Sequence, residues 1–171
     1  MNKIKAIFFD IDGTLIPFGR KEMSKETIDA LNMLKEKGVK IFVASGRGIL
    51  EQGVVTKDVA FDGYITLNGQ ICLDKDYNLY HGNSIHPEDF AVLHRVFQNK
   101  ELPAVLIEEK RAYINYVDEF AEKIHKEIGI KASPIDVYKG DKVYQMILYA
   151  DTAYAEKLFE KLPHCQWSRW H

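Results

Sequence analysis

The sequence predicts an α/β fold with a parallel sheet, followed by a smaller α+β module. Continuous apolar runs in the first half are typical of buried strands, and a helix-forming segment separates the first two of them. In the second half, closely spaced strand-like pairs are separated by helical patterns, which indicates an α+β module. We place the boundary near Gly82, so the predicted domains are 1–81 and 82–171.

The first domain is predicted to alternate strands and helices. Lys5–Phe9 is a continuous apolar run, as expected of a strand buried on both faces. Ser24 is expected to cap a helix that ends at a glycine. Val39–Ala44 and Phe61–Leu67 are predicted strands, with a short helix between them at about 47–55. This alternation is that of a doubly wound sheet.

A hairpin and then a set of strand pairs and helices are predicted to follow. The hairpin has strands at Ile71–Leu73 and Leu79–His81. Pro87 lies where it favours the first turn of a helix. Two strand-like runs then flank the charged turn Glu109–Arg111, and a helix with one apolar face follows. A further strand and a last helix, stopped by Pro163, complete the module.

Composition narrows the class of protein. The chain has 171 residues and a formal net charge of −2, without the basic excess expected of a nucleic-acid binder. Its apolar runs fall short of the roughly 18 residues that a membrane span needs, and the N-terminus does not resemble a signal peptide. Cys72 and Cys165 are the only cysteines. We therefore expect a cytoplasmic protein with neither nucleic-acid nor membrane partners.

Two carboxylates, Asp10 and Asp12, follow the first predicted strand in the stretch FFDIDGTL. Ligands of parallel α/β sheets bind where the strands end, and Gly13 permits a sharp turn there. One carboxylate can attack a phosphorus centre while the other transfers protons, and Mg²⁺ would offset the repulsion between the anions. The alternative is that these residues only form a turn, because Asp and Gly are favoured in turns.

The stretch FFDIDGTL resembles the first motif, D-x-D-G-[TV], of the haloacid dehalogenase superfamily of phosphohydrolases. The resemblance implies that Asp10 is the nucleophile and that Asp12 is the general acid and base. It also implies that the Asp10 carboxylate and the Asp12 backbone carbonyl hold Mg²⁺.

The second predicted strand ends in IFVASGR, which is similar to the second motif of the same family. The resemblance implies that Ser45 binds the transferring phosphoryl group. Its hydroxyl and the amides after it, from Gly46 onward, can surround phosphate oxygens at the start of a helix. Arg47 can steady the phosphate or the leaving group. The alternatives are that Ser45 is only a helix cap and that Arg47 is a solvated side chain.

The segment ITLNGQ resembles the Cof-type branch, or subclass IIB, of this family. In that branch the chain leaves a Rossmannoid core after the third strand and builds an α+β cap domain, which commonly selects sugar phosphates and other small phosphorylated metabolites. The resemblance implies that Asn68 lies near the substrate. The alternative is that Asn68 and Gly69 form a two-residue hairpin turn.

The resemblance covers about the first two-thirds of a typical member. A lysine and an acidic G-D-x-x-N-D motif follow the cap in this branch, and the chain contains neither after its cap-like part. Gly140-Asp141 is expected to be only a turn. We therefore expect a chain truncated after the cap, with an incomplete core sheet. The uncovered sheet edge could support a homodimer.

The sequence thus predicts a magnesium-dependent phosphatase that acts on a small phosphorylated metabolite, such as a sugar phosphate, through an aspartyl-phosphate. A phosphomutase or phosphotransferase is the first alternative, and an inactive phosphate-binding module is the second. The charged stretch Glu108–Arg111 is interpreted as a solvated hairpin tip or as a loop that contributes to specificity. His94 and His125 are expected to be ordinary surface or core residues.

Overall fold

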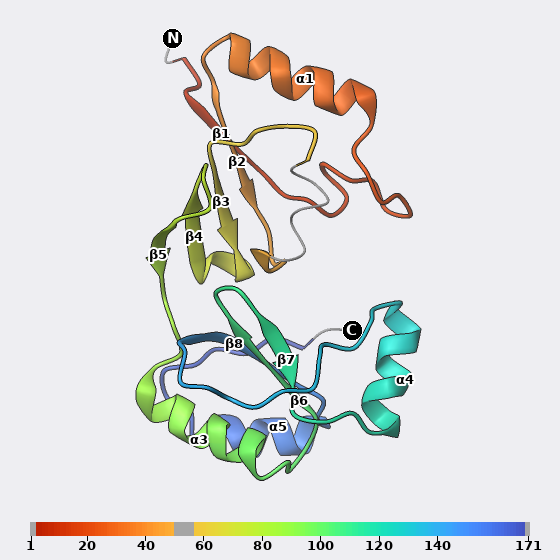
Figure 1. Cartoon of the computed structure of the whole chain (residues 1–171), viewed down its shortest axis with the longest axis vertical. Coiled ribbons are helices and arrows are strands. Elements are labelled where there is room, and N and C mark those ends of the chain that lie inside the picture. The colour runs from red at the N-terminus through yellow and green to blue at the C-terminus, as the bar shows by residue number, and fades with distance from the viewer. Residues whose placement is uncertain (1–2, 50–56, 170–171) are drawn as a thin grey trace. The chain divides into compact units, whose positions relative to one another are not determined.

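The computed structural model describes residues 3–49 and 57–169, which form two compact units divided after Asn83 (Figure 1). The first unit comprises residues 1–83 and the second comprises residues 84–171. The division lies close to the predicted boundary at Gly82. Each unit has its own sheet, and no helix in the described part of the chain is long and apolar enough to cross a membrane.

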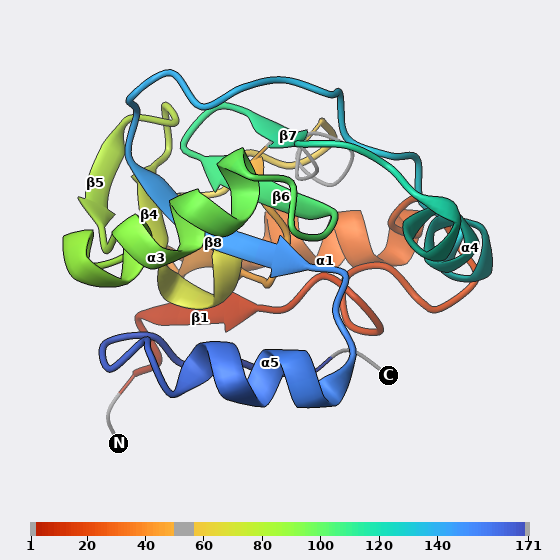
Figure 2. The same cartoon turned by 90° about the horizontal axis from the view of Figure 1, so that it is seen from below.

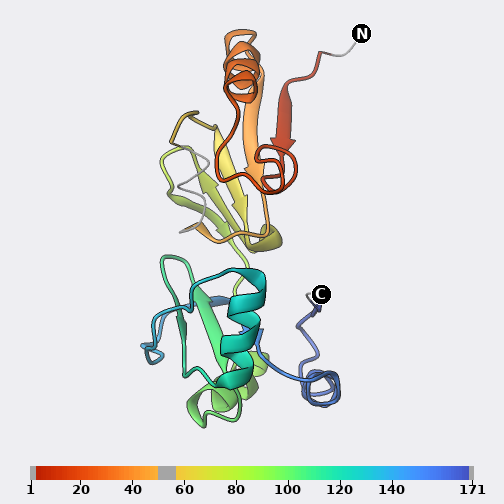
Figure 3. The ribbon, with the colours of Figure 1, turned by 90° about the vertical axis from the view of Figure 1, so that its right-hand side faces the viewer.

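The first unit contains a five-stranded mixed sheet in the order β1-β2-β3-β4-β5. Strands β1, β2 and β3 are parallel, whereas β4 and β5 form an antiparallel hairpin beside β3. Figure 3 shows β1 at one margin of this sheet, next to β2. The predicted α/β class and the hairpin are confirmed. The strands are β1 (Ala6–Phe9), β2 (Lys40–Ala44), β3 (Gly63–Thr66), β4 (Ile71–Asp74) and β5 (Leu79–Gly82).

The prediction that the first strand is buried on both faces is wrong. Burial alternates along β1, and Phe8 is 56% exposed, with its ring stacked on Phe42 at 4.8 Å between centroids. Within the described residues β1 pairs only with β2, so it is an edge strand. In contrast, Ile41 and Val43 on β2 are fully buried, because β2 has a neighbour on each side.

Helix α1 (Lys25–Glu36) connects β1 to β2, as predicted. The Ser24 hydroxyl accepts a hydrogen bond from the Thr27 amide at 3.2 Å and caps the helix. Leu31 is buried on its inner face. The helix predicted at about 47–55 lies largely in 50–56, outside the described residues.

The second unit contains a three-stranded antiparallel sheet in the order β7-β6-β8, with helices packed against it. Figure 2 shows α3 in front of β6 and β8. Buried residues of α3, such as Leu93 and Phe97, pack with Leu106 of β6 and with Leu158 of α5. The elements are α3 (Pro87–Gln98), β6 (Ala104–Glu108), β7 (Ala112–Ile114), α4 (Glu119–Ile128), β8 (Val143–Leu148) and α5 (Thr152–Phe159).

Asn115, directly after β7, joins three parts of the second unit through its side chain. The residue is 4% exposed. Its Oδ1 accepts hydrogen bonds from the amides of Ala104 and Tyr116, both at 2.9 Å. Its Nδ2 donates to the carbonyls of Phe97 and Leu102, both at 3.0 Å. One buried amide therefore fixes the end of α3 against the start of β6.

Helix α4 buries different residues from those its apolar pattern suggests. Phe120 and Ile128 are each 50% exposed, while Ala121 and His125 are buried. The His125 Nε2 lies 2.6 Å from the Tyr149 hydroxyl. His125 is thus a core histidine with a polar partner, in agreement with the expectation that it is an ordinary residue.

Candidate functional site

The ends of the three parallel strands coincide at one edge of the first sheet. Phe9 is paired with Val43, and Ala44 is paired with Ile65, so the residues that follow each strand emerge together. The Ser45 amide donates to the Ile65 carbonyl at 2.9 Å. Polar side chains placed just after these strands therefore gather at the edge where parallel α/β sheets bind ligands.

The loop after β1 holds its apolar residues inward and leaves both carboxylates exposed. Ile11, Leu15 and Ile16 are at most 4% exposed. Asp10 and Asp12 are both exposed. The Asp10 carboxylate accepts no hydrogen bond from the part of the chain that the structure describes. It is thus available to a ligand without first breaking a contact within these residues.

Gly13 permits the tight conformation of this loop. Its φ is +80°, and its amide donates to the Ile16 carbonyl at 2.8 Å. A Cβ at this position would lie 2.7 Å from the ring of Phe18, whose side chain covers the glycine. The positive φ therefore favours glycine here, whereas the Phe18 ring, which is 86% exposed, could move aside for a Cβ.

Asp12 forms a bidentate ion pair with Arg47. The Arg47 Nη2 lies 2.6 Å from Asp12 Oδ1, and its Nε lies 3.0 Å from Oδ2. The hydrogen bonds and then the positive charge of Arg47 lower the pKa of Asp12, although partial burial opposes them. In this arrangement Asp12 is held as a carboxylate, with both of its oxygens paired to Arg47.

Ser45, Gly46 and Asn68 lie together beside this ion pair. Ser45 is 7% exposed, and its Oγ accepts a hydrogen bond from the Arg47 amide at 3.2 Å. Its carbonyl accepts one from the Asn68 amide at 3.2 Å. A Cβ at Gly46 would lie 2.9 Å from Asn68 Oδ1. The structure therefore brings the predicted residues at positions 12, 45, 46, 47 and 68 into one group.

The connection that carries Asn68 has a strained backbone. Leu67, Asn68 and Gly69 have φ values of 50°, 55° and 95°, all in the left-handed region. The hairpin connection spans four residues, 67–70, so it is longer than the two-residue Asn-Gly turn considered as an alternative. Asparagine tolerates this region, but leucine rarely adopts it, and no sequence pattern predicted its strain.

The site offers oxygen ligands suited to Mg²⁺. The Asp10 carboxylate is exposed, and the Asp12 carbonyl accepts no backbone hydrogen bond from the described residues. Carboxylate and carbonyl oxygens are ligands that Mg²⁺ prefers. In residues 3–49 and 57–169, no third acidic, histidine or cysteine side chain joins the two aspartates in a group able to hold a metal. The residues present thus fit part of a magnesium site.

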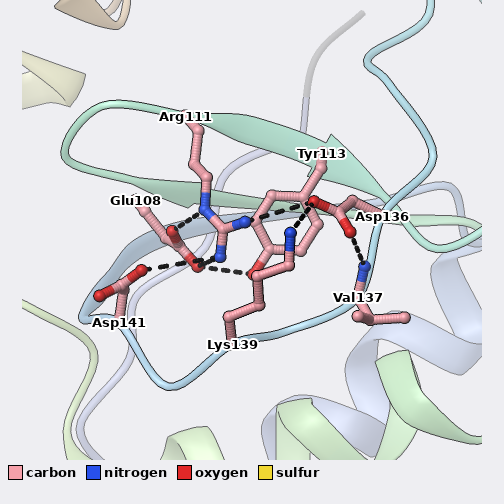
Figure 4. Close-up of polar contacts among 7 residues, drawn as sticks. All are labelled: Glu108, Arg111, Tyr113, Asp136, Val137, Lys139 and Asp141. Atoms are coloured by element: carbon pink, nitrogen blue, oxygen red, sulfur yellow. Dashed lines mark hydrogen bonds and ion pairs between the residues drawn. The ribbon is translucent and has the colours of Figure 1, made fainter.

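The second unit contains a separate charged cluster, shown in Figure 4, around Arg111. Glu108 is 4% exposed, and its carboxylate forms a bidentate pair with Arg111. The Tyr113 hydroxyl donates to Glu108 Oε1 at 2.6 Å, and the Arg111 guanidinium lies over the Tyr113 ring at 4.6 Å. Asp136 and Asp141 lie 3.3 and 3.7 Å from Arg111. Glu108 and Arg111 are therefore not a solvated hairpin tip, because their charges are paired within the unit.

A hollow of about 420 Å³ lies in the second unit, next to this cluster. Asp136 belongs to both, and Asn115 lines the hollow as well. None of the residues predicted to carry the chemistry lines it. The remaining lining residues are His94, Phe97, Gln98, Lys100, Ile135, Val137 and Tyr138.

Comparisons with known proteins identify the family and the fold of the chain. A family model described as haloacid dehalogenase-like hydrolase matches residues 7–169. The curated relative "Putative phosphatase YkrA" of Bacillus subtilis is 25% identical, and the match covers 98% of this chain and 65% of the relative. A "Putative phosphatase" of Haemophilus influenzae is 27% identical over 79% of this chain and 50% of its own length.

Solved structures of two phosphatases have the same fold. One, from Bacteroides thetaiotaomicron, belongs to the haloalkanoate (HAD) superfamily; it has a TM-score of 0.83 and 26% identity, with 98% of this chain and 64% of that chain covered. The other is a subclass IIB sugar phosphatase with a TM-score of 0.75 and 28% identity, with 98% and 66% covered. The chain therefore spans between 50% and 66% of the length of these relatives.

Proposed function

Because this chain belongs to the haloacid dehalogenase-like hydrolases, which its residues 7–169 match, we propose that it hydrolyses a small phosphorylated metabolite through a phosphorylated Asp10. The observation that carries the proposal is the exposed Asp10 carboxylate at the same sheet edge as Ser45 and the Asp12–Arg47 pair. The sugar phosphatase at 28% identity supports a sugar phosphate as the substrate class. The proposed location is the cytoplasm, which the unpaired Cys72 and Cys165 support.

The proposed reaction has two steps that use the two aspartates differently. An Asp10 oxygen attacks the phosphorus atom, the bond to the ester oxygen breaks, and Asp12 gives its proton to the departing alkoxide. In the second step Asp12 takes a proton from a water molecule that attacks the phosphorus of the acyl-phosphate. The bond to Asp10 breaks, and inorganic phosphate and the free carboxylate are formed.

Arg47 is proposed to change partner when the substrate binds. With Asp12 paired to Arg47, the carboxylate is held ionised and cannot donate a proton. A phosphate dianion is a second bidentate acceptor for a guanidinium, and it carries more negative charge than a carboxylate. Transfer of Arg47 to the phosphate would leave Asp12 able to take up the proton that the first step needs.

The Asp10 carboxylate and the Asp12 carbonyl are the residues proposed to hold Mg²⁺. When bound, Mg²⁺ would supply positive charge that offsets the repulsion between the phosphate and the carboxylates. The Ser45 hydroxyl and the amides after it are proposed to orient the phosphoryl oxygens, at a position where the chain already turns away from the sheet.

The proposal is tested by phosphate release from p-nitrophenyl phosphate and from a panel of sugar phosphates, using the protein that carries this chain. We expect release that stops with EDTA and returns when Mg²⁺ is restored. Magnesium-dependent binding of vanadate without release from any ester would instead favour a phosphate-binding module. Transfer of the phosphoryl group to a second sugar rather than to water would favour a phosphomutase.

The contact between Gly46 and Asn68 gives a second prediction. Gly46→Ala is expected to lower kcat/KM by about tenfold, which corresponds to roughly 1.4 kcal/mol, because its Cβ would displace the Asn68 side chain. Asn68→Gly removes that side chain and still suits a φ of 55°. In the Asn68→Gly background, Gly46→Ala should therefore cause little further loss. Equal losses in both backgrounds, measured by steady-state kinetics, would rule out this contact as the cause.

A further inference from the structure

We propose that His86, Glu88 and His164 form a binding site for a divalent transition metal ion in the second unit, with Zn²⁺ as the best-matched ion. Their ligand atoms all lie within 4.8 Å of one another. The two imidazole rings have their centroids 3.8 Å apart, and His164 Nε2 lies 3.3 Å from Glu88 Oε2. The proposal is independent of the proposed phosphatase site, whose residues all belong to the first unit.

The separation of two of the three ligand atoms agrees with tetrahedral coordination. Metal–ligand bonds of about 2.0–2.1 Å at tetrahedral angles place two ligand atoms of one zinc ion roughly 3.3–3.4 Å apart. The observed 3.3 Å between His164 Nε2 and Glu88 Oε2 matches this separation. The His86 ring, whose centroid lies 3.8 Å from that of His164, has to turn away from the His164 ring before both can bind one ion. It can do so because all three residues are exposed.

The backbone holds the three residues together without help from the metal. His86 is the cap of α3 and Glu88 lies in the first turn of that helix, so one turn fixes two ligands. The third ligand comes from the segment after α5. This ligand is His164, whose amide donates a hydrogen bond to Oδ2 of Asp89 at 2.9 Å. Asp89 is fully buried. A buried hydrogen bond therefore fixes the His164 backbone beside the same turn.

The ligand set selects the class of ion. Two imidazoles and one carboxylate suit Zn²⁺ and its neighbours among the transition metals, whereas Mg²⁺ and Ca²⁺ prefer oxygen ligands alone. The positive end of the α3 dipole opposes a cation at this place, but the carboxylates of Glu88 and Asp89 in the first turn offset it. Three protein ligands leave a fourth position for water. A bound ion would join the start of α3 to the segment after α5.

The site is tested by calorimetric titration of the chain with Zn²⁺ in a buffer that contains excess Mg²⁺. We expect one zinc ion to bind per chain in the micromolar range or tighter, and Mg²⁺ not to compete. His164→Ala is expected to weaken Zn²⁺ binding by at least about 100-fold. Mutation of a residue that only hydrogen-bonds to a metal ligand already lowers metal affinity by about 10–100-fold, and loss of a ligand should lower it further. His81→Ala is the matched control, because His81 is also exposed but lies outside the cluster.

Binding of Co²⁺ reports the coordination geometry of the site. A single exposed histidine would not give the spectrum of a four-coordinate ion. The chain loaded with Co²⁺ should show the intense visible absorption of a four-coordinate ion, and His86→Ala should remove it. Circular dichroism would establish that the variants remain folded. The proposal is overturned if the unaltered chain binds no Zn²⁺ in the micromolar range, or if His164→Ala and His81→Ala bind it equally well.

Discussion

Asp10→Asn is expected to lower kcat by about 10⁴-fold or more, because an amide cannot form the covalent phosphoryl intermediate. The substitution should leave the free energy of unfolding within about 0.5 kcal/mol, since the Asp10 carboxylate is exposed and accepts no hydrogen bond from the described residues. Loss of turnover in a folded protein would be measured by phosphate release together with urea unfolding.

Asp12→Asn separates the roles of the two aspartates. Loss of general acid and base catalysis costs typically about 10²–10⁴-fold. The first step needs little proton donation when the leaving group is p-nitrophenolate, so Asp12→Asn should release a burst of about one nitrophenolate per site and then slow down. Asp10→Asn should give no burst. A burst from Asp10→Asn, or undiminished turnover by it, would contradict the assignment of Asp10 as nucleophile.

Asn115→Leu is expected to destabilise the second unit by about 3–5 kcal/mol, the largest effect on stability that we predict. Leucine has a similar volume but removes the side-chain partner of two amides and two carbonyls. Of these four groups, the Phe97 carbonyl keeps a hydrogen bond from the Lys100 amide. Each buried polar group left unsatisfied costs about 1–3 kcal/mol, although such costs do not add fully. A loss of this size is a large fraction of the 5–15 kcal/mol by which a typical domain is stable.

The loss can be followed by tryptophan fluorescence in urea, because the Trp167 ring stacks on Phe159 of α5 in the second unit, with 5.2 Å between the ring centroids. Asn99→Leu is the control: Asn99 is exposed, and its effect should stay within about 0.5 kcal/mol. Asn115→Asp keeps the acceptors but loses the donors, so its destabilisation should also exceed that of the control. An unfolding midpoint for Asn115→Leu equal to that of Asn99→Leu would show that the hydrogen bonds of Asn115 contribute nothing.

The sequence predicted best those structural elements that have a local sequence signal. The run before Asp10, the cap at Ser24 and the hairpin after Asn68 each have local signals, and the structure contains the predicted strands, helix and hairpin. Burial of the first strand was mispredicted because it depends on how many neighbours the strand has, which the apolar run itself does not encode. The polar residues after each strand could be placed at one edge because the strands are parallel.

Other features have no local signal. The pairing of Arg47 with Asp12 joins residues 35 positions apart, and the contact of His164 with Glu88 joins residues 76 apart. Asn115 is a single asparagine in a connection, and its four hydrogen bonds depend on where α3 and β6 end. Such contacts follow from the packed arrangement of the chain, so they could not be inferred from spacing alone.

The outer margin of β1 has a practical implication for handling the isolated polypeptide. Within the described residues, its peptide groups on the side away from β2 lack a neighbouring strand, and the adjacent Phe8 ring is largely in contact with solvent. Such a margin is a template onto which another extended segment can add by main-chain pairing. Concentrated solutions are therefore expected to self-associate there, and a proline or lysine substituted along this margin should improve their colloidal behaviour.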